Sequence, residues 1–289
     1  MQKVTKEILK KVYPPRPPET RKYDYGLMIV IGGGEFYSGA PALAALAGFR
    51  TGLDMVRVIA PKRAADIIAS FSPILAAYPL DDTHLLGKHL PLLLSMTAAA
   101  KEVSRGKVSV VIGSGLGRSE ETQKTVLEYL SQVDDTVAVV IDADAIHAVA
   151  KSPAVIAGRQ FVITPNRFEF TLLTNKEVQR AAPADRILIV QEEAARLQTT
   201  LVLKAKVDII SNGKEVFLNE TGSPYMSVGG TGDTLAGTVG AMLARDIDPL
   251  TAAAAGAFIN GKAGELAVAK FKDALVATDL IDAIPEVIA

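Results

Sequence analysis

The 289-residue sequence predicts an α/β protein built on one mostly parallel sheet that helices cover on both faces. Short apolar runs rich in β-branched residues alternate with longer Ala- and Leu-rich segments, as expected when strands alternate with helices. The runs are apolar at nearly every position, which is typical of strands that are buried on both faces. Small, polar or charged residues follow the ends of these runs, where open α/β sheets bind their ligands.

Composition limits the kinds of protein that this chain can be. Hydrophobic residues make up 49% of the chain, enough for one large domain or two small ones, and no later linker clearly divides it. The net charge of −1 gives no indication of a nucleic-acid or anionic-membrane partner. The absence of cysteine excludes disulfides, thiolate chemistry and cysteine-ligated zinc. The charged N-terminus is unlike a signal peptide, and the apolar stretch at 90–100 is too short to span a membrane. We therefore expect a cytoplasmic protein.

The beginning of the chain differs from the rest. We expect a short helix over about Lys3–Val12, followed by the Pro-rich stretch Pro14–Pro18. Because proline cannot donate a backbone hydrogen bond, this stretch should be extended and lie outside the core. The sequence therefore predicts an N-terminal arm over residues 1–25 and a domain over 26–289.

The elements of the domain follow from apolar runs and from turn and capping residues. Ser119 precedes a helical segment as an N-cap, and Asn212-Gly213 is typical of a hairpin turn. We expect strands at 27–31, 55–60, 108–112, 137–141, 161–164, 201–203, 209–211 and 215–218. We expect helices at 40–51 and 119–130, and mostly helix from 234 to the end. Five strand ends could converge on one site, namely those followed by Gly32, Gly113, Asp142, Asn166 and Lys204.

The segment Gly229-Gly230-Thr231-Gly232-Asp233, ahead of a helical run, is the most informative motif. Amides at a helix N-terminus can bind a phosphate, and glycines let a ligand approach the backbone. Asp233 could accept the proton of a hydroxyl that attacks a γ-phosphate. The alternative is a Gly-rich turn with Asp233 as a helix N-cap. The segment is not a Walker A loop, because no lysine follows its last glycine.

Other motifs allow both a functional and a structural interpretation. Asn166 and Glu169 could order Mg²⁺ through water, or they could form a helix capping box. Lys204 could bind a nucleotide or lie in a solvated loop. Asp142 and Asp144 could face the site or cap a helix. The histidines His84, His89 and His147 have no metal-ligand spacing, so we interpret them as structural.

Two Gly-rich loops could form walls of the site. The first, at 32–41, could hold an anionic or planar substrate through backbone contacts. Its spacing differs from that of the dinucleotide-binding fingerprint. The second, Gly113–Gly117, is closer to that fingerprint but lies in mid-chain, and we interpret it as a wall of the same site.

As a set, these motifs resemble the ADP/ATP-dependent NAD(P)H-hydrate dehydratases, a branch of the ribokinase-like superfamily close to the vitamin kinases. The resemblance runs from about Tyr23 to Ala267. The segments that carry it lie at 29–61, 111–118 (VIGSGLGR), 140–146 (VIDADAI), 163–170 (ITPNRFEF) and 201–245. The resemblance implies a three-layer α/β/α sandwich with a mostly parallel central sheet and no separate lid domain.

The resemblance also implies a repair enzyme for hydrated NADH or NADPH. ATP or ADP would phosphorylate the hydroxyl of the hydrated nicotinamide ring, and phosphate would then leave. Asp233 would be the base, and the amides of Gly230, Thr231 and Gly232 would stabilise the transferring phosphoryl group. Asn166 and Glu169 would bind Mg²⁺ through water. The implied substrate contacts are Ala40, Gly117, Asn166 and Asp233, and the implied nucleotide contacts are Lys204, Ala205, Lys206, Val207, Asp208 and Gly232.

Two other functions remain open at this point. A kinase for a vitamin precursor or sugar would use the same Asp233 and stop after phosphoryl transfer, whereas a non-catalytic nucleotide sensor would not need that carboxylate. The choice between ATP and ADP is also open, and Ala205 and Ser223, where relatives often have Gly and Asn, could alter it. The resemblance implies a homotetramer. Because the chain is too short for a fused epimerase domain, we expect a separate epimerase that acts on the same substrate.

Overall fold

The computed structural model describes residues 1–289 and contains one ten-stranded sheet in the order β1-β10-β9-β8-β7-β6-β5-β2-β3-β4. Neighbouring strands are parallel, except that β9 is antiparallel to both β8 and β10. The strand order changes direction between β2 and β5, and this switch point is where open α/β sheets bind ligands. The strands are β1 (Gln2–Lys3), β2 (Leu27–Ile31), β3 (Met55–Pro61), β4 (Ala76–Leu80), β5 (Val108–Ile112), β6 (Ala138–Ile141), β7 (Phe161–Ile163), β8 (Thr200–Leu203), β9 (Asp208–Ser211) and β10 (Val216–Asn219).

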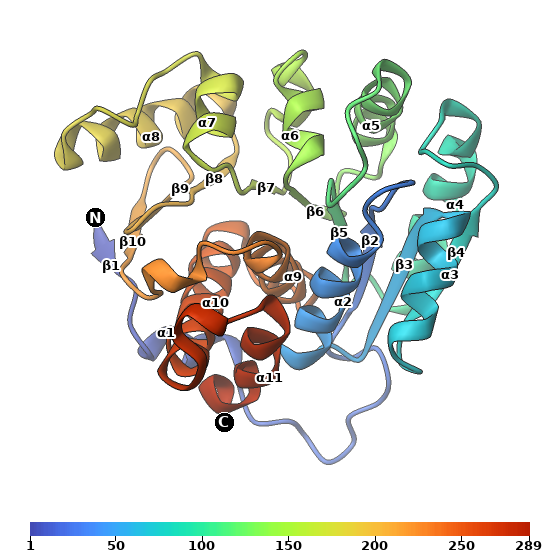
Figure 1. Ribbon diagram of the computed structural model, residues 1–289, viewed down its shortest axis with the longest axis horizontal. Helices are drawn as coiled ribbons and strands as arrows, with labels where there is room; N and C mark the ends of the chain where they lie inside the picture. Colours follow the sequence, from blue (N-terminus) through green and yellow to red (C-terminus); the bar gives the residue numbers. More distant parts are fainter.

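Helices form a layer on each face of the sheet, which confirms the predicted three-layer fold (Figure 1). Each layer buries its own apolar core against the sheet. One layer contains α1 (Glu7–Val12), α2 (Gly39–Arg50), α3 (Lys62–Phe71), α9 (Thr231–Ala244), α10 (Pro249–Phe271) and α11 (Ala277–Ile288). The other contains α4 (Leu90–Val103), α5 (Glu120–Gln132), α6 (Asp144–Val149), α7 (Arg167–Thr174) and α8 (Pro183–Leu197). None of these helices has the length and apolar character that crossing a membrane requires.

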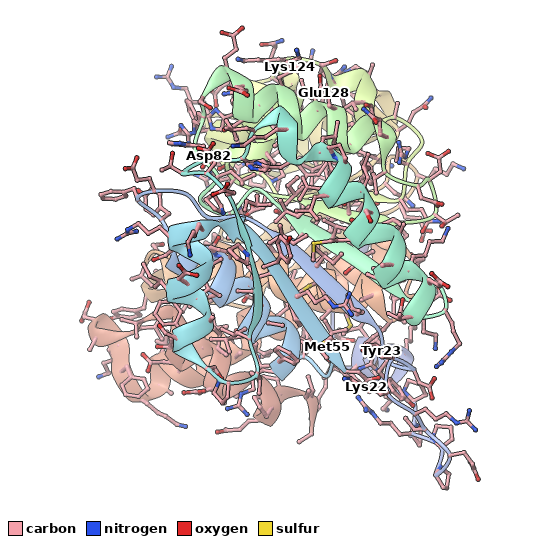
Figure 2. All side chains as sticks on the ribbon, turned by 90° about the vertical axis from the view of Figure 1, so that its right-hand side faces the viewer. Lys22, Tyr23, Met55, Asp82, Lys124 and Glu128 are labelled. Atoms are coloured by element: carbon pink, nitrogen blue, oxygen red, sulfur yellow. The ribbon has the colours of Figure 1, made fainter.

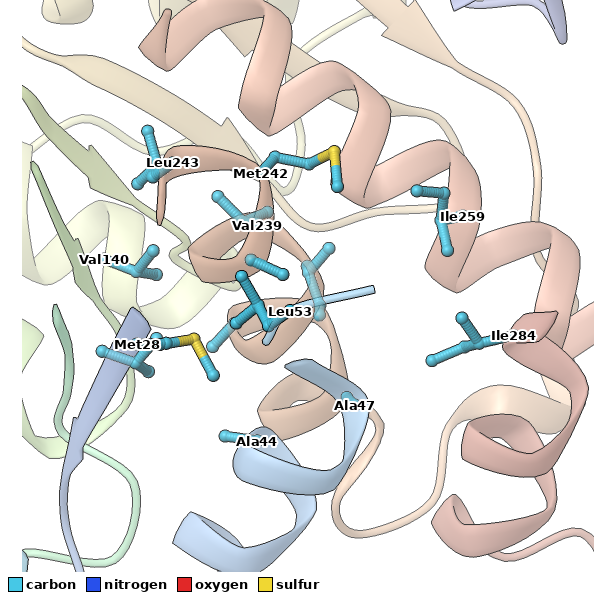
Figure 3. Packing of buried hydrophobic residues seen from close by; sticks show 14 of the residues in the cluster. Met28, Ala44, Ala47, Leu53, Val140, Val239, Met242, Leu243, Ile259 and Ile284 are labelled. Atoms are coloured by element: carbon cyan, nitrogen blue, oxygen red, sulfur yellow. The ribbon is translucent and has the colours of Figure 1, made fainter. Parts of the chain in front are cut away.

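Helix α9 packs closely on β2 and α2, whose Met28 and Ala44 are labelled in Figure 3. Two glycines of α9 face these neighbours. A Cβ atom on Gly237 would lie 2.2 Å from the carbonyl oxygen of Ala44 in α2. A Cβ atom on Gly240 would lie 2.6 Å from the sulfur of Met28 in β2. Any larger residue would push the helix outward, so these glycines fix where α9 lies and where its N-terminal end points.

The first residues of the chain join the domain. Gln2 pairs with Phe217 of β10, so the predicted helix begins at Glu7 and not at Lys3. Helix α1 then buries Ile8 and its apolar neighbours in the same core as α9 and α10. The Pro-rich stretch that follows is extended, as predicted.

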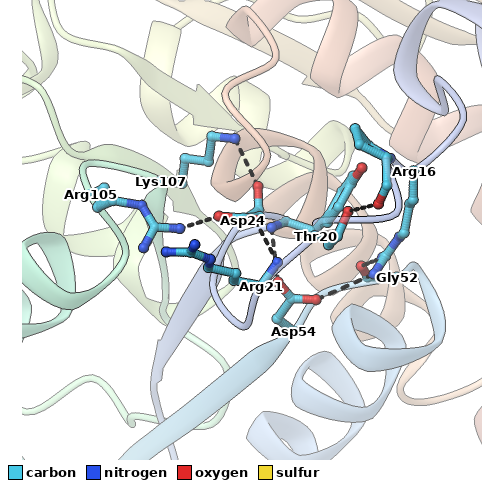
Figure 4. Close-up of polar contacts among 10 residues, drawn as sticks. Arg16, Thr20, Arg21, Asp24, Gly52, Asp54, Arg105 and Lys107 are labelled. Atoms are coloured by element: carbon cyan, nitrogen blue, oxygen red, sulfur yellow. Dashed lines mark hydrogen bonds and ion pairs between the residues drawn. The ribbon is translucent and has the colours of Figure 1, made fainter.

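The arm crosses the amino ends of the strands. Figure 2 places Tyr23 beside Met55, where β3 begins, and places Asp82, which follows β4, at the opposite end of the strands. Arg16 donates to the carbonyl oxygen of Gly52 at 2.9 Å, and the Tyr25 amide donates to Asp54 at 2.9 Å (Figure 4). The arm is therefore held at the end of the sheet away from the carboxyl ends of the strands.

Arg245, which follows α9, completes this attachment. Its guanidinium donates to the carbonyl oxygen of Val12 at 2.8 Å and lies 4.4 Å from the centre of the Tyr13 ring. Tyr13 in turn donates to the carbonyl oxygen of Thr51 at 2.9 Å. The arm is thus tied to the C-terminal end of α9 as well as to the turn after α2.

The predicted strands are all present, within one or two residues at their ends. The sequence pattern does not predict β1, β4 or the helices α3, α4, α6, α7 and α8. Strand β4 is an exposed edge strand that contains Pro79, so it lacks the continuous apolar run of the central strands. Helix α9 begins at Thr231, three residues earlier than position 234.

Candidate active site

The loops that follow β2, β5, β6, β7 and β8 come together with the N-terminal turn of α9. The Gly33 amide donates to the carbonyl oxygen of Ser114 at 2.8 Å, which joins the loops after β2 and β5. Asp142, after β6, accepts from Thr164 after β7 and from Lys204 after β8. These contacts bring the predicted strand-end residues to one edge of the sheet, beside the switch point.

A buried group of charges forms the base of this site. Asp142 is 2% exposed, and its Oδ1 accepts from the Thr164 hydroxyl at 2.7 Å and from Lys204 Nζ at 2.8 Å. Lys204 Nζ also lies 3.9 Å from Glu169 Oε2. Burial lowers the pKa of Lys204, but the Asp142 and Glu169 carboxylates outweigh it and raise the pKa above its usual value. Lys204 is therefore a paired cation whose side chain is 22% exposed, and its interpretation as part of a solvated loop does not fit these contacts.

The first turn of α9 presents free amides above this lysine. Gly230, the N-cap, has a φ of 96°, a conformation that glycine adopts at little cost. The backbone N–H groups of Thr231, Gly232 and Asp233 donate to no other group of the protein. A Cβ atom on Gly232 would lie 3.6 Å from Lys204 Nζ, so the ammonium lies close beneath the amides. Free amides beside a half-buried cation are suited to binding an anion.

Asp233 is the third residue of α9, and so it is not the N-cap that the alternative interpretation requires. Burial raises the pKa of its carboxyl to about 7, opposed by the Ser114 hydroxyl and then by Lys204. Ser114 is 1% exposed, and its hydroxyl has no partner of normal hydrogen-bond geometry. A carboxyl that exchanges its proton near neutral pH suits a general base.

Asn166 and Glu169 form the capping box of α7. The Asn166 amide donates to Glu169 Oε2 at 2.8 Å, and Asn166 Oδ1 accepts from the Glu169 amide at 3.0 Å. Glu169 Oε1 and Asp142 Oδ2 accept no hydrogen bond from the protein. No group of three or more His, Asp or Glu side chains is close enough to hold a metal directly. The donor set therefore fits a Mg²⁺ ion held through water, with two free carboxylate oxygens facing the site.

The segment 204–208, which is the predicted nucleotide contact, turns from β8 into β9. Asp208 accepts from the Ala205 amide at 3.0 Å and from the Asn219 side chain at 3.0 Å. Burial raises the pKa of Asp208 to about 6. Within the segment Lys206 is exposed, and the other four residues are half-buried. Asp208 thus fixes the shape of the turn that follows Lys204.

Of the predicted substrate contacts, Ala40 is the second residue of α2, directly after the first Gly-rich loop, and Gly117 lies on the second loop. A Cβ atom on Gly115 would lie 3.7 Å from Cβ of Ala40, so the loops are in contact. The Gly117 amide donates to Asp144 Oδ2 at 2.9 Å, and Arg118 pairs with Oδ1 of the same carboxylate at 2.7 Å. Asp144 therefore shapes the second loop, while Asp142 contacts Lys204.

Ala143, between these two aspartates, has a strained backbone. Its φ is 47° and its ψ is −121°, a region that residues with a side chain rarely occupy. This conformation sends Asp142 toward Lys204 and Asp144 toward Gly117. Strain of this kind is concentrated at functional sites.

A cavity of about 480 Å³ opens along the two Gly-rich loops. Its lining includes Phe36, Tyr37 and His84. Neither aromatic residue is among the predicted site residues, and His84 is predicted to be structural. The sequence feature that could have identified them is a pair of aromatic residues shortly after the glycine-rich turn Gly32-Gly33-Gly34. A larger cavity of about 650 Å³ lies between α4 and α5 and contains none of the predicted site residues.

Comparisons with known proteins agree with the family resemblance. A family model described as NAD(P)H-hydrate dehydratase matches residues 28–286. A Nitrosopumilus maritimus protein named ADP-dependent (S)-NAD(P)H-hydrate dehydratase is 36% identical over 286 residues, covering 98% of this chain and 96% of that protein. A Pyrobaculum aerophilum protein named bifunctional NAD(P)H-hydrate repair enzyme Nnr is 41% identical over 273 residues, covering 94% of this chain and 52% of that protein. The chain thus spans about half the length of the bifunctional relatives.

A solved structure is similar over nearly the whole chain. It is the ADP/ATP-dependent NAD(P)H-hydrate dehydratase from Bacillus subtilis, co-crystallized with ATP/Mg²⁺. The TM-score is 0.81 at 27% identity, and the match covers 99% of this chain and 97% of that chain.

Proposed function

The chain belongs to the NAD(P)H-hydrate dehydratase family, and we propose that it converts hydrated NADH or NADPH back to the intact cofactor with cleavage of ATP or ADP. The observation that carries the proposal is the placement of Asp233, with a pKa of about 7, beside the free amides of α9 and the half-buried Lys204. The carboxylate suits activation of a hydroxyl, and the amides and ammonium suit a phosphoryl group. The names of the relatives support both the substrate and the nucleotide.

In the proposed reaction, the Asp233 carboxylate accepts the proton of the ring hydroxyl while the hydroxyl oxygen attacks the terminal phosphorus of the nucleotide. The amides of Thr231 and Gly232, with Lys204, stabilise the charge on the phosphoryl oxygens. The shortened nucleotide leaves. Phosphate is a better leaving group than hydroxide, so the carbon–oxygen bond then breaks with assistance from the lone pair of the ring nitrogen. Loss of a ring proton restores the double bond.

The remaining parts of the site support binding. The turn at 204–208 would contact the nucleotide, and Ala40, Gly117 and Asn166 would contact the hydrated cofactor. Mg²⁺, when bound, would neutralise charge on the phosphates, and Asn166 and Glu169, with the nearby Asp142, would hold it through water. The homotetramer, the cytoplasmic location and the separate epimerase that the sequence leads us to expect stay predictions.

The test is to incubate the protein with hydrated NADH and either ATP or ADP, and to follow the recovery of NADH absorbance. We expect recovery that depends on the nucleotide, with release of one phosphate for each NADH. Parallel reactions with each nucleotide measure the preference. Failure to recover NADH, together with phosphorylation of a small alcohol by ATP, would instead indicate a small-molecule kinase.

A further inference from the structure

An exposed aromatic pair faces the cavity along the Gly-rich loops. Phe36 is 84% exposed and Tyr37 is 58% exposed, and both line the cavity. Their ring centres lie 4.9 Å apart at an interplanar angle of 81°, so the edge of one ring meets the face of the other. A large apolar ring in water at the rim of a cavity is unfavourable unless a ligand covers it.

The loop that carries this pair is held in place. Arg63 Nη1 donates to the carbonyl oxygen of Glu35 at 2.8 Å, and the Gly34 amide donates to the carbonyl oxygen of Tyr37 at 3.0 Å. These bonds restrain the backbone on both sides of Phe36. The aromatic face is therefore presented before a ligand arrives, which reduces the entropy lost on binding.

The cavity lies on the opposite side of the β5 loop from the reacting group. Ser114, in the loop after β5, is buried and lies near enough to Asp233 for its hydroxyl to lower the pKa of that carboxyl. The next residue, Gly115, faces the aromatic pair, because a Cβ atom on it would lie 2.8 Å from Cβ of Tyr37. A group bound in the cavity is thus one loop away from Asp233, and it is not the ring that reacts.

Two glycines leave a path between the reacting group and the cavity. Cβ atoms on Gly39, which begins α2, and on Gly117 would meet no atom within 4 Å. A dinucleotide with its hydrated nicotinamide ring at Asp233 would cross these bare positions. Its other end, the adenine ring, would then reach Phe36.

We propose that the cavity lined by Phe36, Tyr37 and His84 binds the adenine half of the hydrated dinucleotide, with Phe36 stacked on the adenine ring. The assignment rests on the proposed function and separates this adenine from that of the nucleotide co-substrate at 204–208. Aromatic side chains bind any base through its flat face, and His84 adds a polar group at the edge of the cavity.

The first experiment compares the steady-state kinetics of Phe36→Ala with those of the unaltered protein. Because loss of a base–aromatic stack weakens binding by about tenfold or more, we expect a KM for hydrated NADH raised by that factor. The kcat and the KM for ATP should change little, and Phe36→Tyr should retain the original KM. Phe271→Ala is the matched control, since Phe271 is 44% exposed at the end of α10. An unchanged KM in Phe36→Ala would overturn the proposal.

The second experiment uses hydrated reduced nicotinamide mononucleotide, which lacks the adenosine half. We expect Phe36→Ala and the unaltered protein to have the same kcat/KM with this shorter substrate. An equal loss with both substrates would mean that Phe36 contacts the nicotinamide half, and the assignment to adenine would be wrong.

A binding measurement separates this proposal from the proposed function. Intact NADH is titrated by its fluorescence while a non-hydrolysable ATP analogue saturates the nucleotide site, and we expect about tenfold weaker binding in Phe36→Ala. If the unaltered protein fails to turn over hydrated NADH but this difference is present, the proposed function fails and the cavity assignment stands. If the unaltered protein turns over hydrated NADH but Phe36→Ala binds intact NADH equally well, the proposed function stands and the cavity assignment fails.

Discussion

Glycines lie in two regions of the α9 segment for two different reasons. In the middle of the helix, Cβ atoms on Gly237 and Gly240 would lie 2.2 Å from Ala44 and 2.5 Å from the nearest atom of the sheet. At the N-terminal end, a Cβ atom on Gly229 would meet nothing within 4 Å, and one on Gly232 only the Lys204 ammonium at 3.6 Å. Packing therefore requires glycine at positions 237 and 240 but not at positions 229 and 232. The proposed approach of a ligand to the backbone would account for the second pair.

The largest effect is expected for Asp233→Asn, which removes the only carboxylate of the N-terminal turn. Loss of a general base lowers turnover by about 10²- to 10⁴-fold, whereas binding of the nucleotide should be unchanged. Single-turnover NADH recovery and nucleotide titration measure the two quantities. Turnover that survives would show that another group takes the proton and that the turn serves binding alone.

Gly232→Ala tests the open region directly. Its methyl group would occupy the space between the amides and the phosphoryl group, so we expect kcat/KM to fall by about 100-fold, as for loss of one oxyanion donor. Thermal stability should be unchanged or slightly raised, because alanine favours helix over glycine by about 1 kcal/mol. Normal activity in this variant would mean that no ligand approaches the backbone at this position.

Gly237→Ala is the matched change in the packed region of the same helix. The new methyl group would clash with the backbone of Ala44, and overpacking of this kind costs about 1–3 kcal/mol. Chemical denaturation measures the loss. A stability equal to that of the unaltered protein would remove the distinction between the two kinds of glycine.

The smallest effect is expected for Ser114→Ala, which changes the surroundings of Asp233 and alters no residue of α9. The Ser114 hydroxyl lowers the pKa of Asp233, so its removal should raise that pKa above about 7. Because the base must be ionised, the rise of kcat/KM with pH should move to higher pH. The pH profile of NADH recovery measures this shift, with both proteins equal well above the midpoint. A shift to lower pH would contradict the role assigned to Ser114.

The sequence predicts those elements of the fold whose residues form a recognisable pattern along the chain. Central strands such as Leu27–Ile31 are apolar at every position because both faces are covered. Strand β4 carries no such signal, because it lies at the exposed edge and contains Pro79. Two-residue β1 is too short to be recognised and forms only because β10 is beside it.

The site divides in a similar way. The order of motifs along the chain predicts the location of Asp233 and Lys204, but not that Lys204 turns inward to Asp142, a residue 62 positions away. That contact depends on two neighbouring strand ends. The capping box of Asn166 and Glu169 is confirmed, while their role toward Mg²⁺ stays a prediction. Phe36 could not be recognised from the sequence as a site residue, because the cavity that it lines is formed together with the distant loop at Gly115–Gly117.

The attachment of the N-terminal arm gives the molecule a mechanical property. Tyr13 and Val12 contact Arg245, the residue directly after α9, and Asp233 lies near the other end of that helix. A 14-residue helix is a stiff rod about 21 Å long. A displacement of the N-terminal arm would therefore shift α9 along its length, and the turn that carries Asp233 would move although the arm contacts the opposite end of the helix.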